Sequence, residues 1–190
     1  HTLCVAITHP EQNANGLEAS GMDVLRILPW GMQSAFAKTR PGYDAETALF
    51  NAAAVLGEKL TACRLRQIAD VVHYLDEQNG YERVVFVGQG PGALLALLAA
   101  ALLPKARGAA LLETQLSFDA LFEADYYFAP ETAFETGLLR LCDLPDLAKL
   151  AGRVCAFTPK NPAGGSLAPH TPTPIPARWE KDALSAAAEW

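Results

Sequence analysis

The segment RVVFVGQGPGALLALLAAALL, residues 83–103, decides the fold of this chain. Its first part, Arg83 to Val87, is a continuous run rich in β-branched residues, which is typical of a central parallel strand buried on both faces. Three glycines and a proline follow within Gly88 to Gly92, and the remainder, Ala93 to Leu103, is apolar on every side, as a buried helix is. The segment therefore predicts a strand, a tight turn and a helix in one core.

Strands and helices alternate on both sides of this segment. Short apolar runs predict further strands at Leu3 to Thr8, Asp23 to Leu28, Gly108 to Leu112 and Val154 to Thr158. Apolar periodicity and turn residues predict helices at Asn15 to Ser20, over most of Ala45 to Gln78, at Leu138 to Leu150 with an interruption near Pro145, and at Ala177 to Glu189. The alternation predicts an α/β fold with a mostly parallel central sheet and helices on both faces.

The chain has 190 residues, of which 51% are hydrophobic, and this is enough for the core of a single domain. We expect that core in residues 1–158, with residues 117–137 as an excursion above the sheet. Residues 159–176 are rich in proline and glycine and predict an irregular segment. Residues 177–190 are expected to form a helix that packs on the same domain.

Composition excludes several classes of partner. The net charge is −6, and the lysines and arginines are scattered, so we expect no nucleic acid and no anionic membrane as a partner. The longest apolar run, Ala93 to Leu103, is shorter than the ~20 residues that a membrane-spanning helix needs, which predicts a soluble protein. The chain opens at His1 without Met or a basic leader, which predicts that its natural N-terminus is processed or lies upstream.

Cysteine and histidine residues show no metal-binding pattern. The four cysteines stand at positions 4, 63, 142 and 155, and the four histidines at positions 1, 9, 73 and 170. No C-x-x-C pair occurs, and the cysteines fall in apolar strand-like runs or in expected helices, where they are predicted to act as small buried hydrophobes. We expect no metal site and no cofactor.

The turn Gly88-Gln89-Gly90-Pro91-Gly92 has the spacing of the nucleophile elbow of α/β-hydrolases, G-x-S-x-G. In such an elbow the serine sits on a strained, exposed turn between a strand and a helix, and the flanking glycines make room for that turn. Gly88 and Gly92 occupy the two glycine positions. Gly90 occupies the serine position and has no side chain with which to attack a substrate.

Over most of residues 1–158 the chain resembles the acetyl xylan esterase-like and dienelactone-hydrolase-like branch of the α/β-hydrolases. The similar segments are the strand that ends at His9-Pro10, GLEASGMDVLRILPWG at residues 16–31, Arg64 to Asp76, and GLLRLCDLPDLAKLAGRVCAFTP at residues 137–159. The resemblance implies an α/β-hydrolase-like fold, an acetylated carbohydrate as ligand, a secreted or periplasmic location, and another domain or subunit of a larger esterase-like protein as partner.

The chain departs from this family where the catalytic acid and base are expected. The loop Pro159-Lys160-Asn161-Pro162 offers no carboxylate, and His170 is the only histidine beyond it. The serines, at positions 20, 34, 117, 166 and 185, are expected away from the elbow, and Asp143 and Asp146 are expected to cap a helix. We therefore predict a catalytically degenerate domain that serves as a structural or binding module.

The turn itself, Gly88 to Gly92, is the predicted ligand-binding segment. Residues that could share its pocket are His9, Gln89, Glu113 and His170.

Two alternatives use the same residues. The pattern G-x-G-x-x-A between a strand and a helix, with Glu113 after the next strand, also matches a dinucleotide-binding turn, in which Gly88, Gly90 and Glu113 would hold the nucleotide. The second alternative is an active carboxylic-ester hydrolase with a non-standard site around His9, Glu113 and His170. Binding of NAD or NADP distinguishes the first alternative, and turnover of an activated acetyl ester distinguishes the second.

Overall fold

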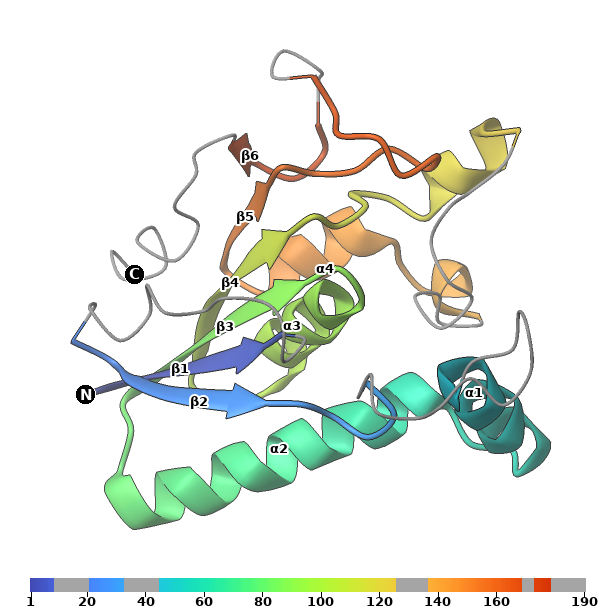
Figure 1. Ribbon diagram of the computed structural model, residues 1–190. Helices are drawn as coiled ribbons and strands as arrows, with labels where there is room; N and C mark the ends of the chain where they lie inside the picture. Colours follow the sequence, from blue (N-terminus) through green and yellow to red (C-terminus); the bar gives the residue numbers. More distant parts are fainter. Residues whose placement is uncertain (9–20, 33–44, 126–136, 169–172, 179–190) are drawn as a thin grey trace.

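A computed structural model of the chain describes residues 1–8, 21–32, 45–125, 137–168 and 173–178. The strands are β1 (Thr2–Ile7), β2 (Asp23–Ile27), β3 (Arg83–Gln89), β4 (Ala106–Leu112), β5 (Arg153–Phe157) and β6 (Ala177–Arg178). They form one sheet in the order β2-β1-β3-β4-β5-β6, and every neighbouring pair is parallel (Figure 1). The predicted α/β class, with a parallel central sheet of the kind expected in an α/β-hydrolase-like fold, is confirmed.

Strand β3 lies in the centre of the sheet, between β1 and β4. Val84 to Val87 are buried, with exposed fractions of 1% or less. A continuous apolar run has no polar face to turn to water, so it is stable only where both faces of the sheet are covered. The central position predicted for this strand is confirmed.

Side chains alternate between the two faces of the sheet, and each face has its own cluster of buried residues. Leu3, Val5, Val84 and Phe86 belong to the first cluster. The helices packed against that cluster are α2 (Leu60–Asn79), α3 (Pro91–Leu102) and α4 (Leu144–Leu150), with α3 in contact with the other two.

The second face carries a smaller cluster. It consists of Cys4, Ala6, Val85, Val87, Ala110, Cys155 and Phe157. The helices expected at residues 15–20 and at residues 179–189 lie outside the described residues.

The stretch predicted as largely helical between residues 45 and 78 contains two helices, α1 (Ala45–Val55) and α2. Gly57, with φ +73°, lies in the turn between them. A residue without a Cβ adopts this left-handed conformation without steric cost, so the chain can leave one helix and enter the next within a few residues.

The interruption predicted near Pro145 is confirmed, because the helical turn Leu138–Arg140 ends before Asp143 and α4 begins at Leu144, with Pro145 in its first turn. The proline ring fits the φ angle of the first helical residues, whose N–H groups have no partner within the helix. Asp143 caps the helix, and its carboxylate and that of Asp146 form a capping box, so the capping roles predicted for both residues are confirmed. Before α4, the helical turn at Leu138–Arg140 is of the 3-10 type.

The predicted excursion, residues 117–137, is described up to Asp125 and contains the 3-10 helix η2 (Asp119–Glu123). Its start is attached to the cap of α4: Ser117 Oγ donates to Asp143 Oδ2 at 2.5 Å, and the Phe118 N–H donates to Asp143 Oδ1 at 2.8 Å. One carboxylate therefore fixes both the helix and the segment that leaves β4.

The C-terminal helix predicted from Ala177 is wrong for its first two residues, because Ala177 and Arg178 form β6 beside β5. The Ala156 N–H donates to Pro176 O at 2.8 Å. Strand β5 would otherwise leave unpaired N–H and C=O groups at the edge of the sheet, and the proline-rich segment returns the chain to pair with them. The remaining residues of the predicted helix lie outside the described residues.

All four cysteines are free thiols, and none of the described helices is long and apolar enough to cross a membrane. Cys4 and Cys155 are buried, as predicted, whereas Cys63 and Cys142 are partly exposed. Burial raises the pKa of the Cys4 thiol to about 12. The described residues contain no cluster of side chains suited to a metal ion.

These differences in exposure predict the pattern of thiol labelling. At pH 8 a disulfide reagent such as DTNB should modify Cys63 and Cys142 in the native protein before Cys4 and Cys155, because these two residues are partly exposed and the other two are buried. Cys4 and Cys155 should react only after unfolding in guanidinium. Single cysteine-to-alanine variants identify the reacting residues, and a Cys4→Ala variant that lowers native labelling would contradict this assignment.

Candidate functional site

The turn between β3 and α3 has the geometry of a nucleophile elbow. Gly90 caps the N-terminus of α3 with φ 54° and ψ −121°, so the positive φ predicted for this residue is confirmed. Apart from its two neighbours in the chain, no atom of the described residues would lie within 4 Å of a Cβ added to Gly90. The turn therefore presents its central residue to open space, at the point where a hydrolase would present its serine.

The two flanking glycines are required by close backbone contacts. A Cβ at Gly88 would lie 2.3 Å from Gly92 O, and a Cβ at Gly92 would lie 2.2 Å from Ile7 O. Both distances are far below van der Waals contact. Helix α3 consequently begins directly against the ends of β1 and β3, and only glycine fits at either position.

The Gly90 turn lies where the sheet changes its direction of winding. The chain passes from β1 to β2 on one side and from β3 to β4 on the other, so β1 and β3 are neighbours whose connections diverge (Figure 1). In open α/β sheets, ligands bind in the crevice outside the carboxyl ends of two such strands. His9 belongs to the segment that follows β1 in the sequence, and that segment lies outside the described residues.

Two residues predicted to share the pocket, Gln89 and Glu113, are in direct contact. Gln89 Nε2 donates to Glu113 Oε2 at 2.6 Å. Lys160, which was not predicted, lies on the other side of the carboxylate, with Nζ 3.9 Å from Glu113 Oε1. Lys160 lies in the loop after β5, where a hydrolase of the resembled family would place its catalytic acid. The carboxylate near the turn is that of Glu113, which follows the neighbouring strand β4.

Residues after three adjacent strands adopt positive φ angles. Gly90 follows β3, Glu113 follows β4 with φ 50°, and Thr158 follows β5 with φ 45°. For residues with a Cβ this conformation is strained by about 1–3 kcal/mol, and such strain is common at binding and catalytic sites. Hydrogen bonds hold these residues side by side, from the Gly90 N–H to Leu112 O and from the Glu113 N–H to Phe157 O, both at 3.0 Å.

One serine, Ser166, contacts Lys160, and the prediction that the serines lie away from the elbow itself stays a prediction. Lys160 Nζ donates to Ser166 Oγ at 3.2 Å. A serine is activated by a base that can accept its proton, and a lysine does this only when its ammonium form is destabilised. Lys160 Nζ is the donor in this contact, with the Glu113 carboxylate on its other side. The contact therefore positions Lys160 and does not make a nucleophile of Ser166.

Pro91 cannot supply the backbone donor that follows the nucleophile in a hydrolase elbow. In a hydrolase elbow the N–H of the residue after the nucleophile stabilises the oxyanion, and proline has no N–H. The Gly90 N–H is engaged by Leu112 O, and the Ala93 N–H donates to Gly90 O at 3.0 Å. The Gly92 amide has no hydrogen bond to another backbone group in the described part of the chain.

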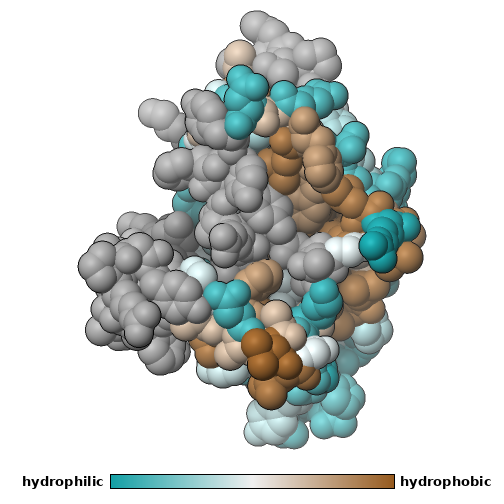
Figure 2. All heavy atoms as spheres, turned by 90° about the vertical axis from the view of Figure 1, so that its right-hand side faces the viewer, coloured by the Kyte–Doolittle hydropathy of each residue, from teal (hydrophilic) through white to brown (hydrophobic). Residues whose placement is uncertain are grey.

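Two of the predicted site residues cannot be placed relative to the turn. His9 and His170 lie outside the described residues, so their distance from Gly90 stays a prediction. Figure 2 faces the right-hand side of Figure 1, toward which β1 and β2 point, and shows hydrophobic and hydrophilic surface interspersed among the described residues. This side of the molecule is neither uniformly apolar nor uniformly polar.

A comparison with models of protein families found no match, and a comparison with curated proteins found none either. Function is therefore argued from the geometry of the site.

Proposed function

We propose that this chain is a catalytically degenerate α/β-hydrolase-like domain that binds a ligand at the Gly90 turn. One observation carries the proposal: the elbow stands at the change of winding of the sheet and leaves space among the described residues beside its central residue, but that residue is glycine. Glycine cannot supply the covalent nucleophile of a hydrolase, and Pro91 cannot supply an oxyanion donor. The geometry favours holding a molecule over cleaving it.

The ligand class follows from the polar groups beside the turn. Glu113 offers acceptors, Gln89 offers a donor and an acceptor, and Lys160 offers donors; a hydrogen bond joins Glu113 to Gln89 and an ion pair joins it to Lys160. Such a mixture suits a hydroxyl-rich ligand, because each sugar hydroxyl both donates and accepts hydrogen bonds. Together with the resemblance to acetyl xylan esterases, this supports an acetylated carbohydrate as the ligand.

Titration with O-acetylated xylotriose, followed by ¹H–¹⁵N NMR, tests this proposal. Saturable shifts are expected at the amides of residues 88–92 and 113–114. A hydrogen bond to a charged group contributes roughly 1.5–3 kcal/mol, so Glu113→Gln should weaken binding at least about tenfold. Glu123→Gln, at an exposed carboxylate on η2, is the control and should bind like the wild type. Equal affinity of Glu113→Gln and wild type, or no saturable shift at the turn, would overturn the proposal.

Restoring a serine at the elbow should not restore catalysis. In Gly90→Ser the hydroxyl has space, but its activation needs a base within hydrogen-bond reach and an oxyanion donor at the next residue, which is Pro91. Hydrolysis of p-nitrophenyl acetate should therefore rise less than about tenfold over the wild type, or about 1.4 kcal/mol in activation free energy.

An inactive wild type and an inactive Gly90→Ser variant together support the proposal that the domain is catalytically degenerate. A gain of about three orders of magnitude, roughly 4 kcal/mol, would mean that a competent base is already in place. Turnover by the wild type above the buffer rate would favour the alternative of an ester hydrolase with a non-standard site.

Dinucleotide binding is a second candidate, favoured by the hydrogen bond that places Glu113 beside the glycine turn. Pyrophosphate binding at a helix N-terminus depends on backbone N–H groups directed at the phosphates. At this turn Pro91 has none, and the Gly90 and Ala93 amides are already engaged, so the dinucleotide is the weaker candidate. Titration with NAD and NADP under the same NMR conditions separates the two functions.

A further inference from the structure

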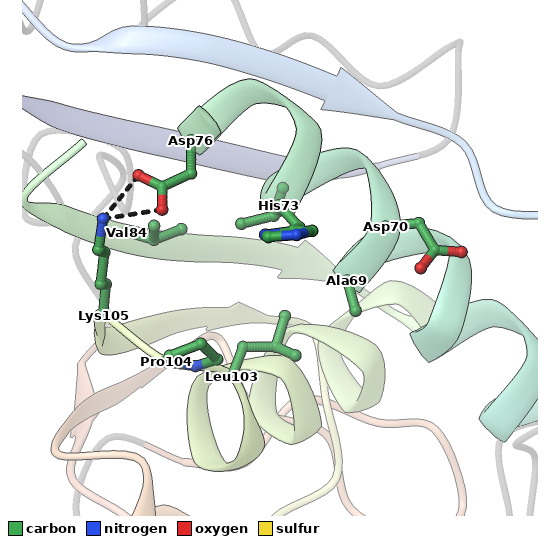
Figure 3. Close-up of a pocket in the computed structure, with 9 residues that line it drawn as sticks. Ala69, Asp70, His73, Asp76, Val84, Leu103, Pro104 and Lys105 are labelled. Carbon is green, nitrogen blue, oxygen red and sulfur yellow. Dashed lines mark hydrogen bonds and ion pairs between the residues drawn. The ribbon is translucent and has the colours of Figure 1, made fainter. Parts of the chain in front are cut away.

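A cavity lies at the opposite end of the sheet from Gly90, between α2 and the turn that joins α3 to β4 (Figure 3). Val84, near the start of β3, and Lys105, directly before β4, are among the residues that line it. Its volume is about 300 Å³. This is close to the lower limit of roughly 300 Å³ for pockets that hold small ligands.

The walls of the cavity divide into an apolar part and a charged rim. The apolar part consists of Ala69, Val72, Val84, Leu103 and Pro104. The rim consists of Asp70, His73, Asp76 and Lys105 (Figure 3). A pocket of this kind fits a ligand with an apolar body and one polar group, because the body is removed from water while the polar group stays at the mouth.

Two of the rim charges are already paired. Lys105 Nζ lies 2.8 Å and 2.7 Å from the two carboxylate oxygens of Asp76. Lys105 also has a positive φ of 61°, and its carbonyl accepts from the Val84 N–H at 2.9 Å. The Asp76–Lys105 pair therefore fastens α2 to the turn before β4 and offers no net charge to a ligand.

The other two rim residues leave the cavity with an excess of negative charge. His73 Nε2 lies 3.3 Å from Glu77 Oε1, one helical turn further along α2. The Asp70 carboxylate is exposed and has no hydrogen bond or ion pair within the described part of the chain. The balance over Asp70, Asp76, Glu77 and Lys105 is negative, so a cation is attracted to the mouth and an anion is repelled.

We propose that this cavity is a binding site for a small amine with an apolar body. The body packs between α2 and Leu103, and the ammonium group faces Asp70. This site is separate from the proposed carbohydrate site, because it lies at the amino ends of the strands and shares no residue with the Gly90 turn.

Titration of the ¹⁵N-labelled protein with 2-phenylethylamine tests the site, with 2-phenylethanol and 3-phenylpropionate as the neutral and anionic analogues. The amine should give saturable shifts at the amides of residues 69–76 and 103–105. An exposed ion pair contributes at most about 1 kcal/mol, so the alcohol should bind about threefold to fivefold more weakly. The carboxylate should bind more weakly again. Equal binding of all three probes, or no saturable shift near the cavity, would overturn the proposal.

Two variants locate the site independently of the probe series. Asp70→Asn removes the unpaired carboxylate and should reduce the affinity for the amine to that for the alcohol, whereas Glu123→Gln should leave it unchanged. Ala69→Leu fills the cavity from α2 and should abolish the saturable shifts, while the rest of the spectrum should remain that of a folded protein. If Asp70→Asn and Ala69→Leu both bind the amine like the wild type, the amine binds elsewhere and the proposal is wrong.

Discussion

Replacing Gly92 with alanine is expected to lower the free energy of unfolding by about 3 kcal/mol or more, because overpacking against backbone atoms cannot be relieved by a rotamer change. The added Cβ would lie 2.2 Å from Ile7 O and 3.2 Å from Ile7 Cγ2. To relieve the contact, α3 would have to move away from β1, and the cluster of buried residues between helix and sheet would open. Gly88→Ala should behave similarly, since its Cβ would meet Gly92 O at 2.3 Å.

Gly90→Ala is the matched control for this prediction. Its Cβ would meet no atom within 4 Å in the described part of the chain apart from its two neighbours, so the expected cost is the backbone strain of a positive φ, about 1–2 kcal/mol. Urea denaturation of the three variants measures the difference, provided that the dependence on urea concentration stays that of the wild type. If Gly92→Ala is as stable as Gly90→Ala, the close approach of α3 to β1 is wrong.

Glu46→Leu should destabilise the protein by about 3 kcal/mol, because it leaves a buried guanidinium without its carboxylate. Arg64 lies on α2 with a side chain only 3% exposed, and its Nη1 donates to Glu46 Oε1 at 2.9 Å. Its Nε donates to Trp30 O at 2.9 Å, and its Nη2 is buried without a partner among the described residues. Water cannot replace the lost carboxylate once leucine fills the same space.

Arg64→Met should be the milder change of the pair. It should lower the free energy of unfolding by about 1–2 kcal/mol, mainly because the Trp30 carbonyl loses its hydrogen-bond donor. The carboxylate left behind belongs to Glu46, whose side chain is 23% exposed and keeps contact with water. The double variant Glu46→Leu/Arg64→Met should be more stable than Glu46→Leu alone, because the buried charge is gone. Thermal or urea unfolding of the three variants measures this coupling. A double variant less stable than Glu46→Leu would contradict the account.

The order of elements along the chain was predictable because each depends on neighbours in the sequence. The β-branched run of β3, the glycines of the turn and the apolar helix α3 are adjacent, and each is decided by backbone preference and burial. The errors fall where local signals are weak or ambiguous. Ala177 and Arg178 were predicted to begin a helix, and they form β6 because β5 offers an unpaired edge to which they pair.

The candidate site was predictable only in part. Gln89 and Gly90 follow from the turn itself, and Glu113 from the end of the next strand. Lys160 stands 47 positions after Glu113 in the sequence, and no pattern joins the two residues, which meet because β4 and β5 are neighbours in the sheet. The burial of Arg64 was equally hidden, since an arginine on a helix is usually exposed and this one is covered by the loop after β2.

The sequence by itself determined that this chain forms a strand, a sharp turn and a buried helix, and that the turn carries no nucleophile, because both depend on the side chains of consecutive residues. Only the tertiary structure decided what surrounds the turn. The contact of Gly92 with Ile7 O, the hydrogen bond between Gln89 and Glu113, and the position of Lys160 all join segments far apart in the sequence. Such contacts depend on which strands pair and in which register, and residue types alone do not specify that.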